Sequence, residues 1–226
     1  MKITYYGHST FSVEIASKSL LFDPFISPNE RASHIDITQI PADYVLLSHG
    51  HQDHLADAKS ILDRTGALLL SNYEIVSWYG QQEITHAHPM NHGGKKTLDF
   101  GSVKCVNAIH SSVLPDGTYG GNPMGFVIES AEGSFYYSGD TALTYDMKLL
   151  GEFHQIDFAI LCIGDNFTMG VEDAIHAAEF VGCDKVIGMH YDTFGYIKID
   201  HQAAKEAFAK AGKSLYLMGI GDSMEI

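Results

Sequence analysis

The segment LLSHGHQDHLADA, residues 46–58, concentrates three histidines and two aspartates in a few positions. The run before it, DYVLLSH at 43–49, is short and apolar, which is typical of a buried strand. Residues 53–65 then place apolar side chains at helical spacing, and Gly66 follows as a C-cap. Polar groups of this kind are costly to bury without partners. The segment therefore predicts a strand-to-helix junction that gathers ligand-type groups at one point.

The spacing within this segment favours a metal site. His49 and His51 are two residues apart and project to the same side of an extended backbone, while Gly50 between them permits close approach. Asp53 and His54 then open the helix, where Asp53 also has the alternative role of an N-cap. Imidazole and carboxylate groups are the ligands that zinc and similar divalent ions prefer. Four such groups within six residues favour metal binding over chance.

Three more candidates each follow an apolar or β-rich run: His110 after VKCVNAI, Asp140 after SFYYSG and His190 after KVIGM. Singly, they fit a hydrogen-bonded turn residue, a cap for the next helix and a partly buried histidine. If the strands are roughly parallel, however, their ends gather at one edge of the sheets. Together with the first cluster they form a set of five histidines and two aspartates.

The order of elements predicts an α/β fold with four layers. A β-rich start is followed by an α/β stretch, a β-rich middle and a second α/β stretch after Asp140. Two similar halves, each a sheet with helices on its outer face, bury both sheets when packed face to face. We therefore expect an αββα sandwich that forms a single domain over residues 1–226.

Composition limits the partners. The formal net charge of −14 disfavours nucleic acid and anionic membranes. An anionic small molecule remains compatible, because a bound cation inverts the local field. No apolar run approaches a membrane span, and MKITYYGHSTFSVEIA lacks the features of a signal peptide. Three cysteines without CxxC spacing indicate reduced thiols. We expect a cytoplasmic protein, with a homo-oligomer left open.

The pattern His49-x-His51-x-Asp53-His54, followed by His110, Asp140 and His190, resembles the metallo-β-lactamase superfamily over nearly the whole chain. More narrowly, the motifs GHS, FDPF, HGHQDHLADA, AIHSS, SGDTAL, IGDNFTMG and MHYDTF resemble the UPF0173 metal-dependent hydrolases, relatives of L-ascorbate-6-phosphate lactonase. The resemblance implies the αββα fold and one or two divalent ions, with zinc or manganese favoured over iron. It assigns His49, His51 and His110 to one metal position, Asp53, His54 and His190 to a second, and Asp140 to a bridge.

Other residues are implied around this centre. Asp23 in LFDPF resembles an acid that orients a ligand histidine, with a turn aspartate before Pro24 as the alternative. His8 in YYGHS is expected near the site as a structural residue or hydrogen-bond donor. Asn166 and Thr168 in DNFTMG can donate to a substrate oxyanion or phosphate, or serve only as loop residues.

The resemblance implies hydrolysis by a metal-activated hydroxide, with Asp53 and Asp140 as the catalytic carboxylates. An ester, lactone, amide or phosphoester bond of a small, potentially anionic molecule fits this chemistry. One alternative is an iron-dependent redox metalloprotein, although di-iron oxidoreductases of the superfamily carry Glu where this chain has His51. The other is a non-catalytic metal-binding interaction protein.

Two further segments lie outside the ligand pattern. THAHPMNH holds His86, His88 and His92 without an acidic partner, and we expect it to be an edge or loop segment. The Gly-rich loop 114–123 follows closely on His110 and is expected to be a mobile lid or specificity loop. Alanine at Gly120 and Gly121 should then change substrate binding more than metal content.

Overall fold

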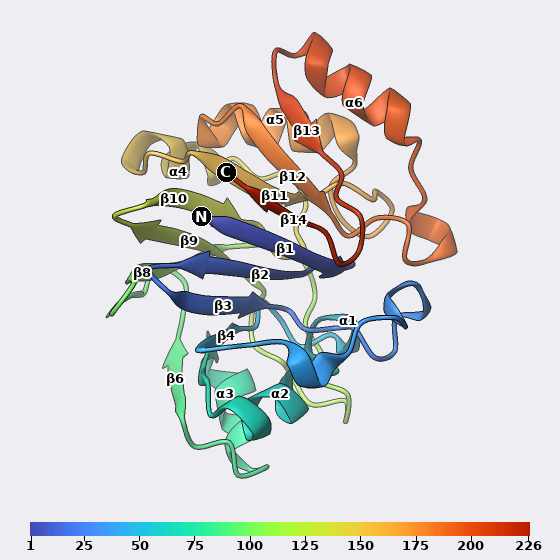
Figure 1. Ribbon diagram of the computed structural model, residues 1–226. Coiled ribbons are helices and arrows are strands. Elements are labelled where there is room, and N and C mark those ends of the chain that lie inside the picture. The colour runs from blue at the N-terminus through green and yellow to red at the C-terminus, as the bar shows by residue number, and fades with distance from the viewer.

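The computed structural model describes residues 1–226 and contains two seven-stranded sheets (Figure 1). The strands of the first sheet are, in spatial order, β14 (Ser223–Glu225), β1 (Lys2–Gly7), β2 (Thr10–Ile15), β3 (Lys18–Phe22), β4 (Tyr44–Leu46), β5 (Leu68–Asn72) and β6 (Ala87–Met90). Those of the second are β13 (Ser214–Tyr216), β12 (Lys185–Met189), β11 (Phe158–Cys162), β10 (Gly133–Tyr137), β9 (Met124–Ser130), β8 (Gly101–Asn107) and β7 (Lys95–Leu98).

The two sheets repeat one topology. In the first, β1, β2 and β3 pair antiparallel, and β3 to β6 continue as parallel strands. In the second, β7 to β10 pair antiparallel, and β10 to β13 continue as parallel strands. The two similar halves expected from the order of elements are therefore present, although the sequence shows no strict repeat.

Helices cover the outer face of each sheet, as Figure 1 shows. Those beside the first sheet are α1 (Gln52–Leu55), α2 (Ala58–Thr65) and α3 (Tyr73–Gly80). Those beside the second are α4 (Met147–Phe153), α5 (Val171–Val181) and α6 (His201–Lys210). Three short 3₁₀ helices, η1 (Glu30–Ala32), η2 (Ile37–Gln39) and η3 (Gly195–Ile197), lie in the connections. The predicted four-layer αββα sandwich is confirmed.

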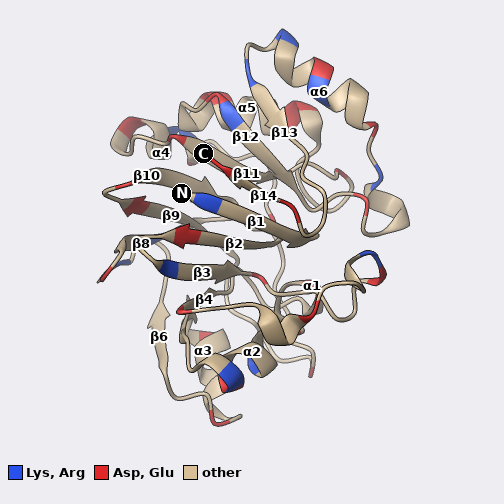
Figure 2. Cartoon of the chain, in the orientation of Figure 1, with Lys and Arg blue, Asp and Glu red and all other residues tan.

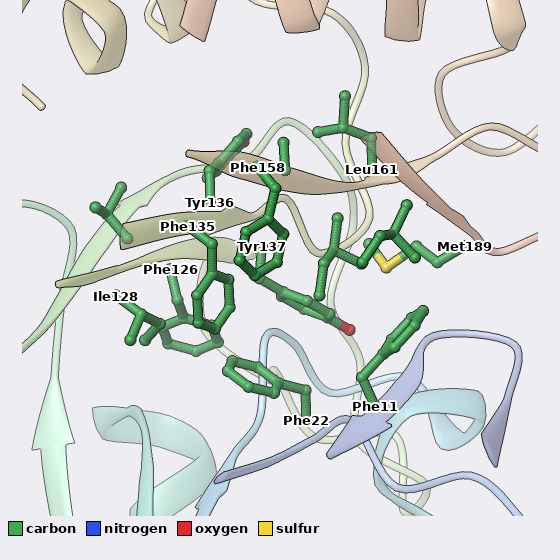
Figure 3. Close-up of a cluster of buried hydrophobic side chains, with 14 of the residues drawn as sticks. Phe11, Phe22, Phe126, Ile128, Phe135, Tyr136, Tyr137, Phe158, Leu161 and Met189 are labelled. Carbon is green, nitrogen blue, oxygen red and sulfur yellow. The ribbon is translucent and has the colours of Figure 1, made fainter. Parts of the chain in front are cut away.

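Alternation along the strands separates the apolar layers. In β3, Leu20 and Phe22 belong to the core between the sheets, whereas Leu21 packs with the layer of α2 and α3. Aromatic side chains fill the space between the sheets (Figure 3). The ring of Phe22 lies 4.8 Å from that of Tyr137 and 5.9 Å from that of Phe135. These contacts join β3 of one sheet to β10 of the other near the strand ends that carry the site.

The helix expected over residues 53–65 is divided in two, which corrects that prediction. α1 ends at Leu55 and α2 begins at Ala58. Between them, the carboxylate of Asp57 accepts hydrogen bonds from the backbone N–H groups of Ile26 and Ser27, at 2.6 and 2.9 Å. This anchor holds the junction against the segment after β3. The C-cap at Gly66 is confirmed, with φ of 67°.

Two short edge strands have no apolar pattern of their own. Ala87–Met90 forms β6 beside β5, so the segment that holds His88 is an edge strand as expected. Ser223–Glu225 forms β14 beside β1 and was not predicted.

No helix in the structure combines the length and the hydropathy that crossing a membrane requires. Lys and Arg residues are scattered singly over the elements in Figure 2, without a continuous basic patch in that view.

Candidate metal centre

The candidate residues lie at the carboxyl ends of strands from both sheets, at one edge of the sandwich. His8 follows β1, Asp23 follows β3, and the segment 49–54 follows β4. In the second sheet His110, Asp140 and His190 follow β8, β10 and β12. Strand ends of an α/β fold are free of ladder pairing on one side, so loops there can bring polar groups together.

Asp140 lies at the centre of the cluster. Its side chain is buried, and its Oδ2 atom is 3.0 Å from Nε2 of His190, 3.3 Å from Nε2 of His54 and 3.6 Å from Nε2 of His110. The alternative that Asp140 caps the next helix is wrong, because α4 begins only at Met147. The carboxylate faces histidines from three separate chain segments instead.

The potential ligand atoms form three groups, of which one joins Asp23 to His49 and His54 and the other two contain the expected ligands. His49, His51 and His110 make one group, in which all the ligand atoms lie within 4.8 Å of one another. Asp53, His54 and His190 belong to a second group on the same criterion, and His8 joins them. The arrangement matches the two ligand sets implied by the sequence, with Asp140 in contact with members of both. The addition of His8 was not expected.

Asp23 is fully buried and accepts four hydrogen bonds. The donors are the backbone N–H of Ser48 at 2.8 Å, Ser48 Oγ at 2.6 Å, Tyr137 OH at 2.8 Å and His54 Nδ1 at 2.9 Å. Ser48 Oγ in turn accepts from Nδ1 of His49 at 2.9 Å. Protons on both Nδ1 atoms leave Nε2 as the potential metal-binding nitrogen of His49 and His54, and Nε2 of His49 lies 3.0 Å from Nδ1 of His51. Asp23 is thus more than the turn residue considered as its alternative role.

Ser48 and Tyr137 were not identified from the sequence. Ser48 directly precedes the first ligand histidine, and that position was the one available signal. Nothing near Tyr137 in the sequence points to Asp23, which lies 114 residues away. The contact depends on the packing of the two sheets.

His8 orients Asp53. Nε2 of His8 is 3.1 Å from Oδ2 of Asp53, and Nδ1 is 3.0 Å from the hydroxyl of Thr193. Burial, together with the nearby His190, lowers the pKa of His8 to about 4, so its neutral ring donates through Nε2 and accepts through Nδ1. Both ring nitrogens of His8 are engaged, which is compatible with the hydrogen-bonding role expected for it.

The alternative role of Asp53 as a helix N-cap is wrong. His51 occupies the N-cap position of α1, and no side chain caps this helix. Asp53 lies in the first turn, and its carboxylate turns toward His8. Its side chain keeps 28% of its surface exposed, more than that of Asp140 or His54, so Asp53 lies toward solvent.

The buried charges fit a divalent cation. Burial lowers the pKa of His49 well below its usual value, which keeps this ligand neutral. Burial also opposes charge on Asp140 and His54, but their mutual attraction and their other partners outweigh it. The pKa of Asp140 is therefore lowered well below its usual value, and that of His54 is raised well above.

Unpartnered atoms support the same fit. Oδ1 of Asp140 and Nδ1 of His190 are buried without a hydrogen-bond partner, and Nε2 of His54 has, within hydrogen-bond distance, only the ion pair with Asp140. Leaving buried polar atoms unsatisfied costs about 1–3 kcal/mol each. A cation bound by nitrogen and oxygen ligands would satisfy such atoms, and the donor set contains no sulfur. The cluster is therefore able to bind metal.

Other candidates lie apart from the cluster. Asn166 is exposed, and the hydroxyl of Thr168 donates to the carbonyl of Met169 at 3.3 Å, so neither contacts a ligand residue. Their role toward a substrate stays a prediction. In the edge segment, His86 and His92 pair with the carbonyls of Gly66 and Pro123, both at 2.8 Å. None of His86, His88 and His92 belongs to a ligand group.

The loop 114–123 is anchored beside the cluster. Asn72 Nδ2 donates to the carbonyl of Gly120 at 2.7 Å, and Trp78 Nε1 donates to Asp116 at 2.7 Å. A Cβ atom on Gly120 would meet Ser112 Oγ and would lie 3.2 Å from Cα of Gly50, the residue between His49 and His51. Alanine at Gly120 should therefore disturb the ligand segment directly, which revises the effect expected from the sequence.

Known proteins share these features. Residues 2–190 match the family model described as the beta-lactamase superfamily domain. A UPF0173 metal-dependent hydrolase of Flavobacterium johnsoniae is 54% identical over 226 residues, covering 100% of both chains. The solved structure of Igni18, a metallo hydrolase of Ignicoccus hospitalis, is 32% identical with a TM-score of 0.87, covering 100% of this chain and 98% of that one. An isothiocyanate hydrolase from Delia radicum gut bacteria shares the fold, with a TM-score of 0.80 at 17% identity, and the match covers 100% of this chain and 99% of that one.

Proposed function

Because this chain belongs to the β-lactamase superfamily, and within it to the UPF0173 metal-dependent hydrolases, we propose that it hydrolyses an ester, lactone, amide or phosphoester bond of a small molecule. The proposed metal ligands are the buried and half-buried groups at the strand ends: His49, His51, Asp53, His54, His110, Asp140 and His190. The observation that carries the proposal is the contact of Asp140 Oδ2 with Nε2 atoms of three histidines.

Divalent ions held by these groups would supply Lewis acidity, which lowers the pKa of a water molecule from 15.7 toward about 7. Zinc or manganese suits a set of nitrogen and carboxylate ligands, with iron as a weaker choice. The separation of the ligands into two neighbouring groups supports room for two ions.

The residues of the chain position and move protons around this centre. Asp53 Oδ2 is held by His8, while Oδ1 makes no hydrogen bond within the protein and is available to accept a hydrogen bond from the attacking water. Asp23 keeps Nδ1 of His54 protonated and, through Ser48, that of His49. These hydrogen bonds fix the orientation of both imidazole rings and leave Nε2 as the nitrogen that would bind a metal.

The cysteines support water as the nucleophile. Burial raises the pKa of Cys162 to about 11 and the pKa values of Cys105 and Cys183 to about 12. These thiols stay protonated and unreactive at neutral pH. The proposed reaction needs no covalent intermediate on the protein.

The net charge of −14 supports a small molecule as the substrate, in place of nucleic acid or a membrane surface. The buried reduced thiols support a cytoplasmic location. Nothing in this proposal depends on whether the protein is a monomer or a homo-oligomer.

A hydrolysis screen tests the proposal. Metal-loaded protein is assayed against esters, lactones, amides and phosphodiesters, with Asp140→Asn as the matched control because it keeps the shape of the side chain. Hydrolysis by the wild type and its loss in the variant are expected. Elemental analysis and visible absorption in parallel separate the redox alternative: tightly bound iron with absorption that responds to reductant, and no hydrolysis, would overturn the proposal.

A further inference from the structure

A cleft lined by aromatic side chains adjoins the candidate metal centre. It has a volume of about 670 Å³ and runs between the segment after β3 and the loop after β12. Phe25 and the 3₁₀ helix η1 line it on one segment, Phe194 and Tyr196 line it on the other, and Phe167 also belongs to the lining. This volume is within the range of small-molecule sites in proteins. Neither this cleft nor the larger cavity of 790 Å³ beside α5 and α6 is lined by a proposed ligand residue.

The buried side chain of His8 lies between this cleft and the metal centre. The ring of His8 is 5.5 Å from that of Phe25 and 5.3 Å from that of Phe194, and its other side contacts Asp53 and His190. Only the side chain of His8 therefore lies between the cleft wall and two proposed ligands, Asp53 and His190. His190 and Phe194 also belong to the same loop after β12.

Phe25 is buried, but the other three aromatic side chains of the cleft are exposed. Phe167, Phe194 and Tyr196 keep 52%, 39% and 77% of their surface open to solvent. The rings of Phe167 and Tyr196 are 6.1 Å apart in an edge-to-face arrangement, which leaves their remaining surface for another ring. Exposed apolar side chains that gather in a concave site indicate ligand binding.

The two walls are held in place before any ligand arrives. Nη1 of Arg31, from η1, donates to the carbonyl of Asp192 at 2.8 Å and lies 3.8 Å from its carboxylate. That carboxylate also accepts from Ile199 N and from His201 Nε2. The side chain of Arg31 therefore links the two walls of the cleft. Aromatic rings and the carboxylate of Glu30 line the cleft, so it disfavours an anionic group.

We propose that this cleft binds an uncharged, ring-bearing part of the substrate and so places the scissile bond over Asp53 and the metal ligands. The inference rests on the hydrolase function proposed above and adds a substrate class to it. A ring between Phe25, Phe194 and Tyr196 would leave the adjoining carbonyl or phosphoryl group within one side chain of the metal centre. Substrates that lack the ring are then expected to react slowly through a high KM.

Binding is tested on the metal-loaded protein by fluorine NMR, so that it does not depend on turnover. The probes are 4-fluorobenzyl alcohol and, as the small matched control, 2,2,2-trifluoroethanol. The double variant Phe167→Ala/Tyr196→Ala should weaken binding of the ring probe about tenfold, because each aromatic contact contributes roughly threefold. Phe153→Ala, an equally exposed aromatic residue on α4, should change nothing. Absence of ring binding, or equal binding by both variants and the wild type, would overturn the proposal.

Turnover is tested separately with ethyl 3-phenylpropionate and ethyl propionate, which share one bond type. A higher kcat/KM for the first ester, reduced in the double variant through KM, supports the proposal. Equal rates for both esters overturn it while leaving the hydrolase function intact. If the ring probe binds but no substrate is hydrolysed, the proposed hydrolase function is wrong, and the cleft is a binding site without that activity. If the double variant alters sedimentation but not ring binding, the cleft is an interface between copies of the chain, and the inference is wrong.

Discussion

Nε2 of His8 lies 3.1 Å from Oδ2 of Asp53, although 45 positions separate the two residues in the chain. The backbone of His8 has a φ of 54°, a left-handed conformation that is uncommon outside glycine, and its carbonyl accepts a hydrogen bond from the backbone N–H of His190 at 2.9 Å. One strained residue therefore fixes the orientation of one proposed ligand through its side chain and contacts a second through its main chain.

We predict that His8→Ala weakens metal binding by about tenfold to a hundredfold, because outer partners of metal ligands typically contribute that much. Competition with a chelator of known affinity gives the measurement, and circular dichroism confirms folding. Thr193→Val, which removes only the partner of Nδ1, should have a smaller effect in the same direction. Unchanged metal affinity in His8→Ala would show that Asp53 does not need this support.

We predict that Asp140→Ala abolishes hydrolysis and lowers the number of ions bound per chain. Its carboxylate contacts histidines of both ligand groups, so its loss leaves buried nitrogens without a counter-charge. His88→Ala, which removes a histidine of the edge strand β6, should alter neither property. Elemental analysis beside turnover makes the comparison. Full metal loading in a folded Asp140→Ala protein would contradict a bridging role.

Removal of metal should stop hydrolysis and leave the fold intact but less stable. An ion at one hundred times its dissociation constant adds about 2.7 kcal/mol to the free energy of unfolding. For a chain of this size that corresponds to a Tm higher by roughly 5–10 °C. Calorimetry before and after exhaustive chelation measures the shift, and zinc or manganese added back should restore activity. Activity that survives chelation would argue against any role for a metal.

Alanine at Gly120 should lower metal affinity. Its Cβ atom would press on Ser112 and approach Gly50, so the ligand segment between His49 and His51 must move. Gly117→Ala is the matched control in the same loop: its φ is +85°, but a Cβ atom there meets nothing within 4 Å. That control should cost about 1 kcal/mol of stability from backbone strain and leave metal binding unchanged. Equal metal affinity in both variants would show that the loop does not influence metal binding.

Stability should depend on pH through Glu129, far from the metal centre. Hydrogen bonds from Lys95 and then His154 lower the pKa of Glu129 to about 2. Because this value lies below that of the unfolded chain, about 4.3, the pairs stabilise the fold fully above that pH and are lost as the pH falls toward 2. Glu129→Gln should lower the unfolding free energy by at most about 1 kcal/mol at pH 7, since the group is partly exposed. Denaturant titrations should show that the difference in unfolding free energy between the wild type and Glu129→Gln narrows below about pH 5. A difference that stays constant with pH would indicate that the substitution acts through packing instead.

The sequence predicts the sandwich because the periodicity is strong where both faces of a strand or one face of a helix are buried. It also predicts which strand ends carry ligand-type groups. It does not predict the break between α1 and α2, because the cause is a contact of Asp57 with Ile26 and Ser27, on a distant segment. For the same reason, β14 is missed: its ladder with β1 supplies the order that its own residues do not indicate.

The N-cap roles considered for Asp53 and Asp140 show a similar limit of what the local sequence can predict. Aspartate near a helix start is a common N-cap, so local statistics favour that role. The structure instead turns both carboxylates toward histidines that come from other strand ends. Only the spatial arrangement of the strands, absent from any local window, distinguishes the two roles.

Each of the two ligand groups draws on both sheets. His49 and His51 follow a strand of the first sheet and His110 one of the second, and the same division separates Asp53 and His54 from His190. An ion in either position would therefore cross-link the two sheets. Its ligand bonds would close a long loop of the chain, as a disulfide does. The side chains that prepare a water molecule for attack would also limit how far one sheet can slide on the other. Amide hydrogen exchange at this edge of the molecule would then report metal occupancy directly.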